Sequence, residues 1–75
     1  MQNEILQLLA EALEVDVNEI NINSTSNDFA EWDSLGHLTI LQQLDAKYNN
    51  ITDNAPELAS ASTVKEIVDS VIANQ

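Results

Sequence analysis

The sequence has no cysteine, one histidine, two residues of the Lys and Arg types together, and one each of Trp, Tyr and Phe. Without cysteine the chain cannot form disulfides or thiolate metal sites, and one histidine cannot make a zinc site. The 75 residues fit a single domain, residues 1–75. A domain of this size buries only about 60% of the surface that its unfolded chain exposes, so the core must be thin.

Basic residues are scarce while acidic residues are abundant. Thirteen Asp and Glu against two Lys and Arg give a formal net charge of −11. No basic patch is available for nucleic acid or an anionic membrane, so neither is expected as a partner, and partner proteins should be basic. A second interpretation is that the acidic residues only keep a small domain soluble.

Long apolar runs are also absent. No stretch approaches the roughly 18 residues that a membrane span needs, and the first residues show no basic segment followed by an apolar one. The oxygen-rich run at residues 21–28 lacks the central Gly and terminal Glu of a calcium loop, so no dedicated metal site is expected. We expect a cytoplasmic, monomeric protein.

Apolar residues recur at helical spacing in three segments. Residues 4–14, 34–48 and 64–72 place apolar side chains three and four positions apart, which predicts an amphipathic helix in each segment. Residues 53–59 are expected to hold one shorter helix. No segment alternates β-branched and polar residues for long enough to predict a strand. The predicted fold is therefore all-α, a four-helix bundle of three main helices and one short helix.

Residues that favour helix ends support these boundaries. Asn3, Asp33 and Thr63 are the expected N-caps of the three main helices, and Glu66 completes a capping box with Thr63. Pro56 is tolerated in the first turn of the short helix, where no N–H donor is needed.

A long loop is predicted between the first and second helices. The apolar residues there are irregularly spaced, and residues 18–27 are rich in Asn, Ser and Thr. A core this small cannot leave two of three aromatic side chains in water, so the apolar loop residues should fold back over the helices. These residues are Val15, Val17, Ile20, Ile22, Phe29 and Trp32.

Asp33 and Ser34 stand at the start of the second predicted helix. Asp and Ser are common at helix starts, so capping alone explains the pair. A hydroxyl at the first residue of a helix also lies beside unpaired N–H groups and the positive end of the helix dipole, which stabilises a phosphodiester formed on that oxygen. Phosphorylation uses the same physics, and the local pattern does not distinguish the two modifications.

Two alternative functions follow from these residues. His37 lies one helical turn after Ser34, so the two side chains have the spacing of a serine nucleophile and its histidine base in a hydrolytic dyad. No orienting carboxylate accompanies the pair and a chain this small has no room for a water-excluding pocket, so the chain is not expected to be an enzyme. The other alternative is an acidic helical interaction module that binds a basic partner, with Ser34 serving only as a cap or a phosphorylation site.

Residues 31–41, which contain Asp33-Ser34-Leu35, resemble the prosthetic-group motif of acyl carrier proteins. Length, acidity and the order of predicted elements are similar to that family over essentially the whole chain. The resemblance implies that a phosphopantetheinyl transferase moves 4′-phosphopantetheine from coenzyme A to Ser34, and that Asp33 and Leu35 flank the attachment site. Acyl or aminoacyl groups are then carried as thioesters on this arm to loading and transferring enzymes. Helical phase predicts that Leu38 lies in the core.

The residues after the motif depart from the family pattern. Carriers of general fatty-acid synthesis usually have an acid directly after Asp-Ser-Leu and several more along the helix, whereas here Gly36 follows and Asp45 is the helix's only acid. These two residues, with His37 and Thr39, are the positions where we expect partner enzymes to bind. Gly36 is unfavourable within a helix by roughly 0.5–1 kcal/mol relative to Ala, which suggests a close partner approach or a loose first turn. We therefore expect a specialised carrier rather than one for bulk fatty-acid elongation.

Overall fold

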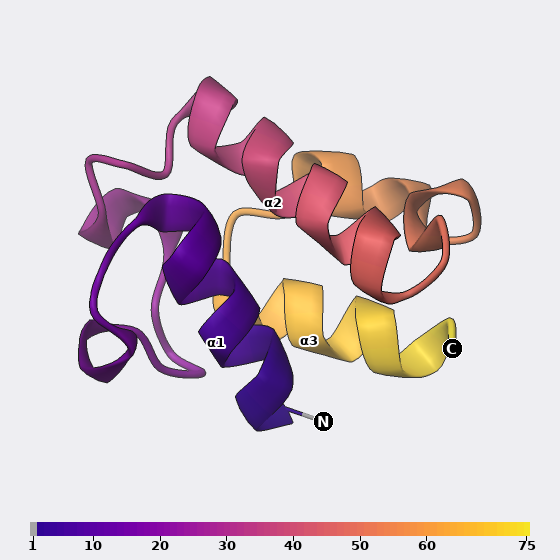
Figure 1. Ribbon diagram of the computed structural model, residues 1–75, viewed down its shortest axis with the longest axis horizontal. Helices are drawn as coiled ribbons and strands as arrows, with labels where there is room; N and C mark the ends of the chain where they lie inside the picture. The colour runs from indigo at the N-terminus through magenta and orange to yellow at the C-terminus, as the bar shows by residue number, and fades with distance from the viewer. Residues whose placement is uncertain (1) are drawn as a thin grey trace.

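Three α-helices form the frame of the protein in the computed structural model, which describes residues 2–75. They are α1 (Gln2–Leu13), α2 (Ser34–Lys47) and α3 (Val64–Ala73). The connections contain the short 3-10 helices η1 (Val17–Glu19), η2 (Ser26–Asp28), η3 (Ile51–Asp53) and η4 (Pro56–Ser60). No strand occurs within residues 2–75, so the predicted all-α fold with three main helices is confirmed (Figure 1).

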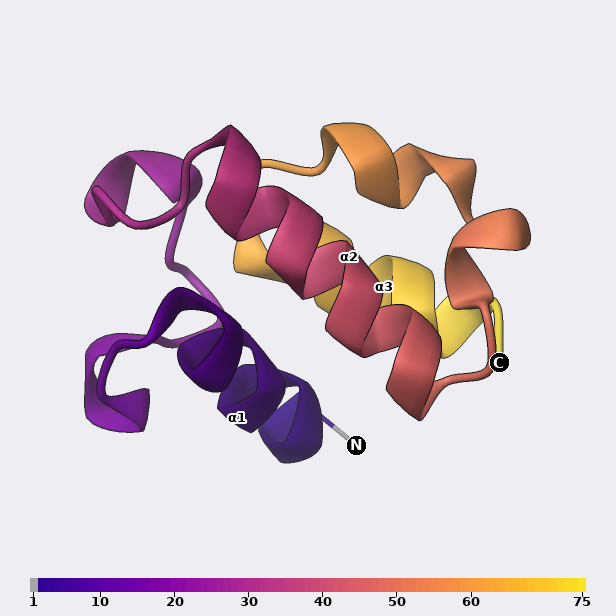
Figure 2. The ribbon, with the colours of Figure 1, turned by 45° about the horizontal axis from the view of Figure 1, so that its top comes forward.

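The helices share one apolar core. Helix α1 contacts both α2 and α3, and α2 lies between α1 and η4 (Figure 2). The largest fully buried side chains are Ile5, Leu9, Ile40, Leu44, Ile51, Leu58, Val64, Ile67 and Val71. Burial of each such side chain stabilises the fold by roughly 1.5–3 kcal/mol. Within residues 2–75, no helix is long and apolar enough to cross a membrane.

Two details of the outer helices differ from the sequence prediction. Helix α1 begins at Gln2, so Asn3 lies inside the helix and its predicted role as N-cap is wrong. In α3 the predicted apolar stripe is buried from Val64 to Val71, but Ile72 is half exposed.

The connection between α1 and α2 is long, as predicted, but it is ordered by local and distant hydrogen bonds. Its two 3-10 turns are η1 and η2. An isolated antiparallel bridge pairs Thr25 with Thr63, where Ser26 N donates to Ser62 O (2.8 Å) and Val64 N donates to Ser24 O (3.0 Å). This bridge attaches the connection to the start of α3 and so helps to position the chain that leads into α2.

Most apolar residues of this connection cover the core, as the sequence predicts. Ile20 and Trp32 are buried, and three further residues are partly buried against the core, namely Val15, Ile22 and Phe29. Val17 is the exception, because it begins η1, a surface turn with no buried residue.

The segment after α2 contains two 3-10 turns where one short helix was predicted. Helix α2 stops as expected at Asn49 and Asn50, which adopt left-handed conformations with φ of 59° and 61°. Pro56 begins η4, also as expected. The Ser70 hydroxyl of α3 donates to the Glu57 carboxylate of η4 (2.5 Å), and this bond is the main cause that lowers the pKa of Glu57. Helix η4 is thereby held against α3.

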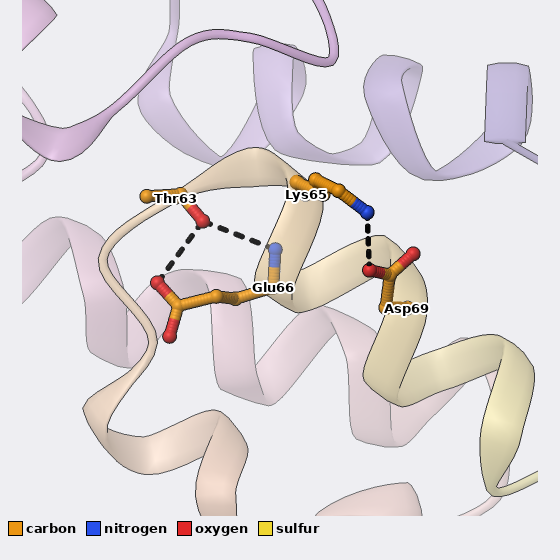
Figure 3. A network of polar contacts seen from close by, with 4 residues as sticks. All are labelled: Thr63, Lys65, Glu66 and Asp69. Carbon is orange, nitrogen blue, oxygen red and sulfur yellow. Dashed lines mark hydrogen bonds and ion pairs between the residues drawn. The ribbon is translucent and has the colours of Figure 1, made fainter.

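The predicted capping box at the start of α3 is present in part: the Thr63 hydroxyl caps Glu66 N as expected (Figure 3), but the Glu66 carboxylate accepts from Ser62 N and not from Thr63 N. Thr63 Oγ1 accepts from Glu66 N (3.1 Å) and donates to Glu66 Oε1 (3.0 Å). The same carboxylate oxygen accepts from Ser62 N (3.3 Å). The bond from Thr63, followed by that from Ser62, lowers the pKa of Glu66.

This lowered pKa of Glu66 makes α3 sensitive to acid. In the folded state the pKa of Glu66 lies below its ordinary value of about 4.3. The hydrogen bonds to its carboxylate therefore stabilise the fold fully above that pH, and this stabilisation is lost as the pH falls through the lowered pKa. Between about pH 5 and pH 2.5, we expect the free energy of unfolding, measured by urea denaturation, to fall less for Glu66→Gln than for wild type. Parallel curves for Glu66→Gln and wild type would contradict the expectation.

Candidate functional site

Ser34 is the first residue of α2 and is exposed. Asp33 caps the helix as predicted, since its Oδ1 accepts from Gly36 N (2.9 Å). Within residues 2–75, the Ser34 hydroxyl and the N–H groups of Ser34 and Leu35 have no hydrogen-bond partner. A free hydroxyl therefore lies beside free donors at the positive end of the helix dipole.

Gly36 is required by a contact inside the protein. A Cβ built at Gly36 would lie 2.1 Å from the carbonyl oxygen of Glu31 and 3.2 Å from Leu13 Cδ2. The absent side chain lets the backbone before Ser34 approach the first turn of α2. This contact supplies a reason for the glycine that needs neither a partner nor a loose turn.

His37 is half-buried. Its Nδ1 accepts from Trp32 Nε1 (3.0 Å), and its Nε2 lies 2.8 Å from the carbonyl oxygen of Leu58 in η4. Both ring nitrogens are therefore engaged away from the Ser34 hydroxyl. In this arrangement His37 has no free lone pair with which to act as a base for Ser34.

The predicted burial of Leu38 is wrong: its side chain is 51% exposed. The buried face of α2 runs through Ile40 and Leu44, and Leu38 lies about 200° around the helix from Ile40 at 3.6 residues per turn. Leu35 is 75% exposed. Two leucines next to Ser34 are thus open to solvent or to a partner.

Thr39 and Asp45, two of the predicted partner contacts, make hydrogen bonds within the chain. Thr39 Oγ1 donates to Leu35 O (3.1 Å) inside α2. Asp45 is half-buried, and its two carboxylate oxygens accept from the backbone N and the hydroxyl of Thr52, each at 2.9 Å. The structure therefore gives Asp45 an internal role that joins the end of α2 to η3.

An open groove of about 610 Å³ lies beside Ser34, between α2 and the end of η4. It is lined by Ser26, Trp32, Asp33, Ser34, His37, Leu38, Leu41, Ala59, Ser60 and Ala61. A second hollow of about 400 Å³ shares Leu38, Leu41 and Ala59 with the groove and continues toward Thr52. A mainly apolar surface thus extends from the serine along α2.

Charge is distributed unevenly around this site. Residues 34–44 include no Asp, Glu, Lys or Arg, although the chain carries a net charge of −11. Acidic residues lie instead on α1, on the connection before α2, near the end of α2, on η3 and η4, and on α3. Across the described part of the chain, no three His, Asp or Glu side chains are grouped so that they could hold a metal ion.

Comparisons with known proteins add nothing to this picture: no protein family, curated protein or solved structure matches the chain. The sequence analysis predicted Asp33, Ser34 and Leu35 as site residues, and in the structure these three residues form the start of α2. It did not identify Leu58 or connect Trp32 with His37. The only available signal was that the one tryptophan and the one histidine lie five residues apart.

Proposed function

We propose that the chain is a carrier protein that holds acyl or aminoacyl groups as thioesters on a 4′-phosphopantetheine arm attached to Ser34. The observation that carries the proposal is the free, exposed hydroxyl of Ser34 at the first residue of α2, next to the apolar groove. The resemblance of residues 31–41 to the acyl carrier motif supports the same assignment. The chain acts on no substrate itself; other enzymes modify it, and it delivers the bound groups to them.

The residues around Ser34 fit a phosphopantetheine group. In the transfer, the Ser34 oxygen bonds to the phosphorus that bears the pantetheine, the bond to the adenosine bisphosphate part of coenzyme A breaks, and the transferase takes the hydroxyl proton. The resulting phosphodiester is an anion beside the free N–H groups of Ser34 and Leu35, which stabilise negative charge. Asp33 keeps the helix start in place by capping Gly36.

The surface around Ser34 suits enzymes that dock through apolar contacts. Leu35 and Leu38 project from a stretch of α2 that has no charged residue. The acidic residues elsewhere attract basic partners over a longer range and speed their encounter, whereas the leucines supply the local contact. This division supports a specialised carrier rather than a member of bulk fatty-acid synthesis, whose partners bind acids along the corresponding helix.

Arm transfer to the purified chain tests the proposal directly. We expect wild type, incubated with coenzyme A and a broad-specificity phosphopantetheinyl transferase, to gain the mass of one arm by intact mass spectrometry, and Ser34→Ala to gain none. Ser60→Ala is the matched control, because Ser60 lines the same groove, and it should be modified like wild type. An unmodified wild-type chain would refute the carrier function, and a modified Ser34→Ala chain would refute the site.

The stability of Ser34→Ala also shows whether Ser34 is only an attachment site or a residue that stabilises the fold. Because Asp33 still caps α2, we expect Ser34→Ala to unfold within about 0.5 kcal/mol of wild type. A markedly larger loss would mean that Ser34 stabilises the fold. If the chain is instead an interaction module, incubation with coenzyme A leaves the mass of wild type and variant unchanged while both bind the same basic partner.

A further inference from the structure

The only tryptophan and the only histidine of the chain form a bridge across the groove beside Ser34. Trp32 Nε1 lies 3.0 Å from His37 Nδ1, and His37 Nε2 lies 2.8 Å from the Leu58 carbonyl oxygen. The two ring planes are inclined by only 9° and their centroids are 6.2 Å apart. Because an indole N–H lies in the plane of its ring, the rings meet edge to edge through the hydrogen bond.

Only one form of His37 can make both bonds. The Trp32 nitrogen can only donate and the Leu58 carbonyl can only accept, so Nδ1 must be unprotonated and Nε2 must carry the hydrogen. An imidazolium has hydrogens on both nitrogens. Its Nδ1–H would point at the Trp32 N–H, and the two donors could not remain 3.0 Å apart. Trp32 is buried, so its N–H would lose its only partner within the protein.

The bridge joins the segments that determine how Ser34 is presented. Trp32 lies two residues before Ser34, and His37 lies one turn after it on α2. Leu58 belongs to η4, which forms the opposite wall of the groove. Protonation of His37 therefore breaks the connection between the segment that enters α2 and the helix itself.

We infer that His37 is a positioning residue, which in its neutral form fixes the first turn of α2 between Trp32 and η4 and releases this turn when it is protonated. Access to Ser34 thereby depends on pH. This consequence for the arm rests on the proposed carrier function, but the bridge itself does not.

The carboxylates near the ring do not replace the bridge. Asp33 is the only charged residue that lines the groove with His37, and its carboxylate is engaged by Gly36 N. The acids on the other elements around His37 make bonds of their own or are exposed to solvent. These are Asp28 of η2, which accepts from Thr25 N, Glu57 of η4, which accepts from Ser70, and the exposed Glu31. A protonated His37 thus gains no carboxylate partner in this geometry.

Nuclear magnetic resonance of the unmodified chain tests the bridge without any arm. With one indole and one imidazole in the chain, the ¹⁵N signals of Trp32 and His37 need no assignment. As the pH is lowered, we expect the His37 signals to change from the Nε2–H form to the doubly protonated form, and the Trp32 N–H signal to move with the same midpoint. The inference would be overturned if the Trp32 N–H signal did not change when His37 is protonated, or if neutral His37 were in the Nδ1–H form.

Two variants separate the hydrogen bonds from the ring. His37→Gln keeps an acceptor and a donor but cannot be protonated, so the Trp32 signal should stay in its bonded position down to about pH 5. His37→Phe keeps a ring without either bond and should show the released signal at every pH. If His37→Gln behaves like His37→Phe, the positioning role is wrong. Trp32→Phe, which leaves no unpaired donor, should abolish the effect of pH on the first turn of α2.

Arm transfer then connects the bridge with Ser34. Comparing wild type with His37→Gln at each pH cancels the transferase's own pH dependence. We expect the ratio of their kcat/KM values to fall about twofold at the midpoint observed for His37 and further below it, mainly through KM, because affinity decreases with the fraction of competent molecules. A constant ratio would refute the link to Ser34. A wild-type chain that accepts no arm would refute the carrier function, while the resonance experiment would still decide the bridge.

Discussion

Replacing Gly36 with alanine is expected to destabilise the protein by about 1–3 kcal/mol, the usual cost of forcing extra atoms into a packed site. The new Cβ would lie 2.1 Å from the Glu31 carbonyl oxygen, which belongs to the backbone and cannot rotate away as a side chain could. Alanine would ordinarily gain roughly 0.5–1 kcal/mol over glycine inside a helix, so the expected loss reverses the helix preference. The segment from Glu31 to Ser34 must shift to relieve the contact.

This loss is large for a chain of 75 residues. At about 0.05–0.15 kcal/mol per residue, domains of this size have total stabilities of roughly 4–11 kcal/mol. Each kcal/mol corresponds to a change in Tm of about 4–8 °C, so thermal and urea unfolding both resolve the effect. Gln42→Ala is the matched control, because Gln42 is exposed on the same helix, and it should stay within about 0.5 kcal/mol of wild type. Equal or greater stability of Gly36→Ala would contradict the close approach of Glu31.

The helix starts were predictable from the sequence because they depend on residues a few positions apart. Asp33 and Thr63 cap α2 and α3 through backbone N–H groups three residues later, and this spacing is visible in the chain itself. The burial of α3 followed in the same way from one apolar stripe. The same reasoning gave a wrong N-cap at Asn3, because Gln2, the residue before it, is already helical.

Helix α2 shows why local periodicity did not decide which leucines are buried. Apolar residues occur on more of its circumference than one core can cover, so several phases satisfy the pattern. The placement of α1 and η4 on either side selects Ile40 and Leu44 and leaves Leu35 and Leu38 exposed. The site gains an apolar surface that the sequence interpretation of Leu38 had assigned to the core.

Two contacts near Ser34 could not be predicted because each of them involves a backbone carbonyl. His37 binds the carbonyl of Leu58, 21 residues away, and Gly36 faces the carbonyl of Glu31. Every residue has such a carbonyl, so no residue type marks the partner. These contacts become visible only when η4 and the segment before α2 are placed in space.

Asp45 offers the second large effect, and it decides between an internal and a docking role. Its two carboxylate oxygens accept from Thr52 N and Thr52 Oγ1, each at 2.9 Å in a half-buried setting. Hydrogen bonds to charged groups contribute about 1.5–3 kcal/mol, and removing the acceptor leaves the Thr52 N–H unpaired. We therefore expect Asp45→Ala to lower the free energy of unfolding by about 2 kcal/mol, measured by urea denaturation.

Two further variants separate this bond from the loss of a charge. Asp53→Ala removes a nearby exposed acid of η3 and should stay within about 0.5 kcal/mol of wild type. Asp45→Asn keeps one oxygen for Thr52 N, so its stability should lie between those of wild type and Asp45→Ala. If partner enzymes bound Asp45 by its charge, Asp45→Asn would raise KM for arm transfer while Asp45→Ala left stability unchanged. We expect Asp45→Ala to lose stability and Asp45→Asn to leave the KM for arm transfer unchanged, because both carboxylate oxygens of Asp45 already hold the end of α2 against η3. Asp45 thus stabilises the helix that begins at Ser34.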